Sequence, residues 1–188
     1  MTDAMDQPYV IRPFINVMDL VGIPNEVMAH HLSLYGSYVN GANDLLNLRR
    51  ARSEYGDAAR PLNPVQSAAE LRLPHLINGI RLHELYFEQF VSGGTPYDHE
   101  YGWGPYLDQL YALYMIGGPG WAVLGQPQYG QGQLMTYRVQ GHADGNLAGY
   151  EPILVIDTWE HAYEWTTKEL AWDAVMANID WNVVASRL

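Results

Sequence analysis

Apolar residues recur at helical spacing in the first half of the chain and gather in short runs in the second half. In the first half they predict two long helices, at about residues 25–52 and 67–91, with a kink or split at Pro74. A stretch containing glycine and prolines, residues 53–67, predicts a loop between them. The two helices should therefore form an antiparallel hairpin.

The second half shows shorter patterns. Residues 105–116 predict a helix with proline in its first turn. Three short segments, 121–125, 134–139 and 152–157, are separated by hairpin-like loops and predict an antiparallel sheet. Helix is expected again after Glu160, with a break before the C-terminus.

These elements predict an α+β fold. It consists of an N-terminal antiparallel helical hairpin domain (1–91), a linker (92–104) that contains S-G-G-T-P, and a C-terminal domain (105–188). The C-terminal domain should hold a three-stranded antiparallel sheet flanked by helices.

Composition narrows the possible functions. The chain is 48% hydrophobic and 16% charged, which is typical of a globular protein. Its net charge of −11 and its lack of a basic stripe argue against nucleic acid and anionic membranes as partners. No apolar run could cross a bilayer, and Met1–Pro8 does not resemble a secretion signal. The absence of cysteine fits a cytoplasmic protein and leaves His, Asp and Glu as metal ligands.

The strongest candidate chemistry follows the last predicted strand. The apolar run Ile153–Ile156 ends on Asp157, and His161 comes four residues later. A carboxylate at the end of a rigid strand and an imidazole one turn further can converge on one point. Trp159 and Tyr163 lie beside them and can exclude water. We interpret this stretch as half of a metal site.

The string D-T-W-E-H-A-Y at 157–163 also resembles the Asp-x-Trp-Glu-His-Ala-Tyr signature of the iron/manganese superoxide dismutases. The string M-A-H-H-L-S-L-Y-G-S-Y-V-N at 28–40 resembles their first metal-binding helix, where Tyr-Val-Asn begins eight residues after a histidine. The resemblance makes His30 a metal ligand and Tyr38 the tyrosine that gates the substrate channel. His31 points about 100° away and is expected to be structural. Without the resemblance, a lone histidine such as His30 is more often a partly buried residue of an amphipathic helix.

Two more segments carry the resemblance. N-x-x-x-L-H-E-L-Y-F at 78–87 is similar to the second metal-binding helix of the family, which implies that His83 is a ligand with Phe87 beside it. By itself, an aromatic stripe around a histidine is more often core. G-P-G-W-A-V-L-G at 118–125 is similar to a Gly-Ser-Gly-Trp strand, which places Trp121 against the metal.

The resemblance therefore implies four ligands: His30, His83, Asp157 and His161. Three imidazoles and one carboxylate suit Mn or Fe with an open position better than a closed zinc site. We expect one Mn or Fe ion per chain. Gly79 favours the manganese-type arrangement, but the same ligands serve both metals, so the sequence does not decide between them. The implied activity is that of a superoxide dismutase, an antioxidant oxidoreductase that converts superoxide to oxygen and hydrogen peroxide.

A hydrogen-bond donor to the metal-bound solvent is also implied. Iron-type members often place a glutamine four residues before the second histidine ligand, where this chain has Gly79. The donor should then be His142, in V-Q-G-H-A-D-G-N, with Gln140 as the alternative. A histidine in a glycine-rich loop is otherwise usually exposed to solvent.

The resemblance also implies a homodimer in which Glu160 reaches the metal-binding histidine of the partner subunit. The simpler alternative for Glu160 is a solvated acid near a helix start.

Three positions depart from the family pattern. Leu34 stands where a histidine at the channel mouth is usual, Glu164 stands where a tyrosine is usual, and Lys168 is the nearest cation to an expected arginine. An acidic mouth should slow an anion. Two alternatives to a dismutase therefore stay open: a metalloprotein of the same fold with other redox chemistry, and a non-catalytic metal-binding or scaffold protein.

Overall fold

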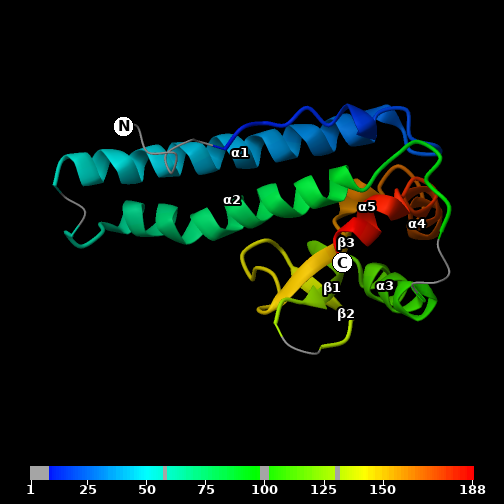
Figure 1. Cartoon of the computed structure of the whole chain (residues 1–188). Coiled ribbons are helices and arrows are strands. Elements are labelled where there is room, and N and C mark those ends of the chain that lie inside the picture. The colour runs from blue at the N-terminus through cyan, green and yellow to red at the C-terminus, as the bar shows by residue number, and fades with distance from the viewer. Residues whose placement is uncertain (1–8, 57–58, 98–101, 130–131) are drawn as a thin grey trace.

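A computed structural model describes residues 9–56, 59–97, 102–129 and 132–188. The first eight residues, which we do not expect to be a secretion signal, lie outside this description. In the N-terminal half, α1 (Asn25–Glu54) and α2 (Pro64–Glu88) run antiparallel as a long hairpin (Figure 1). The second helix begins earlier than predicted, because Asn63 and Gln66 form a capping box and Pro64 occupies the first turn. Pro74 does not split it.

The sheet has three strands: β1 (Gly120–Pro127), β2 (Met135–Gln140) and β3 (Tyr150–Asp157). Their order is β2-β1-β3, and both pairings are antiparallel, as predicted. The register sets Trp121 of β1 opposite Asp157 of β3. This pairing fixes the indole beside the carboxylate that ends the buried strand.

Short helices flank the sheet. They are α3 (Gly104–Ile116), α4 (Lys168–Met176) and α5 (Trp181–Ser186), with a 3-10 turn, η4 (Glu160–Ala162), directly after β3. A further 3-10 turn, η2 (Ile15–Val17), precedes α1. The α+β class is confirmed.

The predicted linker is anchored by hydrogen bonds where the structure describes it. The N–H of Gly93 donates to Asn178 Oδ1 (3.0 Å), and the N–H of Thr95 donates to Ile179 O (3.0 Å). A Cβ on Gly94 would lie 2.8 Å from Ala177 O, so the chain passes too close to the end of α4 for a side chain. The division into two domains with boundaries at 91 and 105 stays a prediction.

A buried amide is one of the contacts that join the hairpin to the sheet. β3 is at an edge of the sheet, and Gln89, at the end of α2, completes its hydrogen bonding at Val155. The side-chain Nε2 donates to Val155 O (2.6 Å), and the N–H of Val155 donates to Oε1 (3.2 Å). Gln89 is fully buried, so no water can replace it. Among the described residues, no helix combines the length and apolarity that crossing a membrane requires.

Replacing Gln89 with leucine should destabilise the protein strongly. The substitution strands both backbone groups of Val155 in the core, at a cost of about 2–4 kcal/mol in free energy of unfolding. Urea unfolding in the presence of a chelator measures this. Gln109→Leu, at an exposed position of α3, is the matched control and should change stability by less than about 0.5 kcal/mol. Equal effects of the two substitutions would contradict the role assigned to Gln89.

Candidate metal centre

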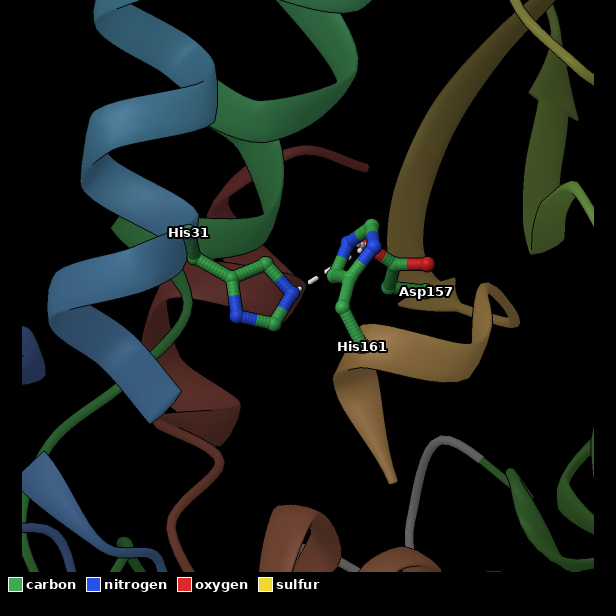
Figure 2. Close-up of side chains that lie close together, drawn as sticks. All are labelled: His31, Asp157 and His161. Carbon is green, nitrogen blue, oxygen red and sulfur yellow. Dashed lines mark hydrogen bonds and ion pairs between the residues drawn. The ribbon is translucent and has the colours of Figure 1, made fainter. Parts of the chain in front are cut away.

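Three ionisable side chains meet where α1, β3 and η4 come together. His31 reaches from α1, Asp157 ends β3 and His161 lies in η4 (Figure 2). The Nε2 atoms of His31 and His161 lie 3.3 and 3.2 Å from the same carboxylate oxygen, Oδ2 of Asp157. One ligand atom from each residue lies within 4.8 Å of the others, which makes the cluster a candidate metal site.

The placement of His31 follows from the buried stripe of α1. Val27, Tyr35 and Val39 are buried and lie at helical intervals from His31. A histidine within such a stripe must face the core, and the His31 side chain is only 1% exposed.

Asp157 and His161 are positioned by the end of β3. Oδ1 of Asp157 accepts a hydrogen bond from the backbone N–H of Trp159 (2.8 Å), which fixes the carboxylate and leaves Oδ2 for the histidines. The chain then turns through η4, and His161 faces back toward Asp157 (Figure 2).

The hydrogen bonding of His31 indicates that a cation belongs in this cluster. Nδ1 lies 3.1 Å from Val27 O, and because a carbonyl only accepts, Nδ1 must carry the proton. If the ring is neutral, Nε2 carries no proton, and its lone pair faces the carboxylate oxygen of Asp157. Two acceptors at this distance repel each other unless a second proton or a metal ion satisfies both.

His83 provides a second, independent indication. Its Nδ1 donates to Gly79 O (2.7 Å), which leaves Nε2 as an acceptor. Nε2 is buried and has no hydrogen-bond partner in the described part of the chain. The ring lies 6.3 Å from that of His31, between centroids, so the unpartnered atom belongs to the same region. Burial lowers the pKa of His83 to about 3, so the ring stays neutral, which is the form that binds metals.

The electrostatics favour an ionised carboxylate. Burial alone would raise the pKa of Asp157, but the rings of His161 and His31 beside its Oδ2 hold the pKa below its ordinary value. One carboxylate and three imidazoles are a donor set suited to Fe or Mn. The residues present therefore fit such an ion.

The two adjacent histidines lie differently from what we expected, and which of them is a metal ligand stays a prediction. His30 is exposed on α1 and does not join the cluster, whereas His31, expected to be structural, does. The physical reason is the helix itself: neighbouring residues differ by about 100°, and the buried stripe passes through position 31. The spacing of His31 from Val27 and Tyr35 was the available signal. The predicted residues His83, Asp157 and His161 do lie together in this region.

The two residues expected to contact substrate or solvent lie next to His83. The rings of Tyr38 and His142 are 5.0 Å apart between centroids and lie 5.4 and 5.7 Å from the His83 ring. A Cβ on Gly79 would approach within 3.0 Å of His142 Nδ1. The small residue on α2 therefore leaves space for an imidazole from the loop after β2. The alternative donor, Gln140, is exposed.

The flanking aromatic residues surround the cluster. Trp121 and Phe87 are fully buried, with ring centroids 5.0 and 5.8 Å from that of His83. Trp159 stacks on His161 at 6.0 Å. Burial raises the pKa of Tyr163, and Lys168 Nζ lies 5.0 Å from the centre of its ring.

An open pocket lies on the outer side of His161. It is lined by His30, Pro119, Trp159, Glu160, His161 and Glu164. Glu160 and Glu164 are exposed, so the pocket is acidic, as the sequence predicted for this side. Leu34 is partly exposed on α1 and does not line this pocket.

Comparison with known proteins identifies relatives over most of the chain. Residues 108–187 match the model of the family described as iron/manganese superoxide dismutases, C-terminal domain. The chain is 31% identical to a superoxide dismutase [Fe] of Aquifex aeolicus over 94% of its own length and 89% of the relative. It is 31% identical to one of Saccharolobus solfataricus (97% and 84%). It is 29% identical to a superoxide dismutase [Mn] of Mycolicibacterium smegmatis (82% and 76%). Relatives named for both metals are present, so similarity does not choose between them.

The buried neutral histidines predict acid sensitivity of the metal-free chain. Burial lowers the pKa of His83 to about 3 and that of His142 to about 4, below the unfolded value of about 6.5. Between about pH 6.5 and 4 the unfolded chain binds more protons, so the free energy of unfolding falls as the pH falls, by up to about 1.4 kcal/mol per pH unit for each ring.

Urea unfolding with a chelator at pH 7, 6 and 5 measures this slope. His142→Gln should give a flatter pH dependence than the unmodified chain. His30→Gln, at an exposed ring, should leave the slope unchanged. Identical slopes for all three proteins would show that buried His142 does not contribute.

Proposed function

Because the chain belongs to the iron/manganese superoxide dismutase family, we propose that it is a superoxide dismutase that uses one Fe or Mn ion per chain. The observation that carries this proposal is the cluster of His31, Asp157 and His161, in which the Nε2 atoms of both histidines lie close to one carboxylate oxygen. The orphaned Nε2 of buried His83 supports it from a second element.

The proposed ligands are His31, His83, Asp157 and His161. His30, which the family spacing favours, is the competing candidate for the first position. Burial and proximity to Asp157 support His31, since His30 is exposed and contacts the site only through a ring distance of 5.8 Å to His161.

The chemistry that Fe or Mn supplies when bound is one-electron exchange between its trivalent and divalent states, which releases oxygen from one superoxide and hydrogen peroxide from the next. Protons for the peroxide must come through the protein. Burial, with the charge of Asp157, raises the pKa of Tyr38, so its hydroxyl keeps its proton at neutral pH. Tyr38 and the neutral ring of His142 lie in contact beside His83, where they can hold solvent and pass a proton.

The aromatic side chains exclude bulk water from these ligands. Trp121 and Phe87 close the side of His83, and Trp159 covers His161. Excluding water strengthens every electrostatic interaction inside the site.

A homodimer that joins two such sites through Glu160 is also proposed. Glu160 is exposed beside His161, in a position open to a partner subunit. Such a contact would cover part of the acidic pocket.

A second candidate function is a different redox reaction at the same centre. The observation that favours it is the pair Glu160 and Glu164 in the pocket beside His161, which repels a small anion on this side. A neutral or cationic organic reductant would enter this pocket more readily than superoxide.

Metal analysis and a dismutase assay on one purified sample test the proposal. We expect about one Fe or Mn per chain and rapid dismutation, with both lost in His161→Ala. A full metal site without dismutation would favour the second candidate. A chain that binds no metal would overturn both and favour a scaffold role.

A paired substitution tests the first ligand. His31→Ala should lower metal affinity by at least about 100-fold and abolish dismutation, because it removes a direct ligand. His30→Ala should keep the metal and most of the activity. Competition against a metal-binding dye measures the affinities, and the thermal midpoint of each metal-free variant is the folding control. If His30→Ala loses the metal and His31→Ala keeps it, His30 rather than His31 is the first metal ligand.

A further inference from the structure

The ring of His142 has two polar atoms to satisfy, and the proposed function uses one of them. Both Nδ1 and Nε2 are buried without a hydrogen-bond partner among the described residues. The residue is 1% exposed, so bulk water does not reach it. Leaving a buried ring nitrogen unpaired costs about 1–3 kcal/mol. If the proposed function is correct, one nitrogen can form a hydrogen bond with solvent in the metal centre. The other nitrogen then needs a different hydrogen-bond partner.

Nδ1 of His142 faces α2. The space that a Cβ of Gly79 would fill lies 3.0 Å from this atom. His75 lies four residues before Gly79, on the same stripe of α2. Its ring centroid is 4.9 Å from that of His142, with 52° between the ring planes, and 5.8 Å from that of Tyr38. His75 therefore places a second imidazole on the side of the His142 ring toward which Nδ1 points.

His75 has the chemistry to pair with that nitrogen. It is partly exposed, so it connects the buried ring of His142 to the surface of α2. Burial and the charge of Arg72 lower its pKa, so the ring is mostly neutral at pH 7 and carries one N–H donor and one acceptor. The same helix also fixes the backbone of His142, since Asn78 Nδ2 donates to His142 O (2.7 Å).

We propose that His75 is a positioning residue for the reaction: it donates a hydrogen bond to Nδ1 of His142, directly or through one water. This pairing holds His142 in the tautomer that carries its proton on Nε2. The Nε2–H group is then the donor that faces solvent in the metal centre. The residue acts through His142 and touches neither the metal nor the substrate.

Nitrogen NMR of the ¹⁵N-histidine-labelled full chain tests the pairing. Spectra are recorded with and without zinc, a diamagnetic ion that histidine and carboxylate ligands hold. We expect His142 as a single Nε2–H tautomer. His75→Phe keeps an aromatic ring but removes the donor, and should give a mixture of tautomers. His75→Gln supplies an amide N–H and should restore the single tautomer. An unchanged His142 signal in His75→Phe would overturn the proposal.

Kinetics of the Fe- or Mn-loaded chain provide the second readout. His75→Phe should lower kcat about 10-fold at unchanged metal content and unchanged KM, and His75→Gln should recover most of it. Leu71→Phe, at an exposed position one turn earlier on α2, is the matched control and should leave kcat unchanged. An unchanged kcat in His75→Phe would also overturn the proposal. If the unmodified chain shows no dismutation but the tautomer shifts as expected, the proposed function fails and the pairing of the two rings stands.

Discussion

The constraint on which the site depends is a fully buried carboxylate that must stay charged. Asp157 ends a strand in the centre of the protein, where burial alone would favour its neutral form. Its charge is tolerated because the N–H of Trp159 satisfies one oxygen and two imidazole nitrogens face the other. Since the proton on His31 is directed to a backbone carbonyl, its contact with Asp157 is satisfied only by a second proton on that ring or by a metal ion. Side chains from α1, β3 and η4 therefore meet at a candidate metal site.

The helical hairpin contributes histidines of the candidate metal site that the sheet does not carry. β3 brings a carboxylate and, through η4, one histidine, but the other imidazoles come from α1 and α2. Gln89 fixes the relation between α2 and β3 by pairing with both backbone groups of Val155. Because this contact lies two residues before Asp157 on the same strand, the packing of helix on sheet also sets the position of the carboxylate relative to His83.

Much of this could be predicted from sequence because the relevant signals are local. The long helical periodicities, the turn residues and the apolar run before Asp157 each determine their own element. The family resemblance added the chain order of the site residues. The residues next to His30 and His31 in the sequence do not by themselves show which of the two faces the core. The choice depends on which face of α1 meets the core, and the buried stripe through Val27, Tyr35 and Val39 supports the proposal of His31. His75 carried no family motif, so only the packing of α2 against the loop of His142 reveals it.

The position of Gly79 shows how a residue without a side chain can govern the chemistry of a site. With a larger residue there, the rings of His142 and Tyr38 would have to shift, because the added Cβ would lie 3.0 Å from Nδ1 and 3.1 Å from Tyr38 Cγ. The backbone carbonyl of Gly79 accepts the proton of His83 Nδ1 and so leaves the other nitrogen of that ring as a buried acceptor. One turn of α2 therefore sets the tautomer of His83 through its backbone, makes space for His142 through its missing side chain, and presents His75 to the same ring. A substitution at Gly79 would alter all three at once, so individual roles must be separated at His75 and His142.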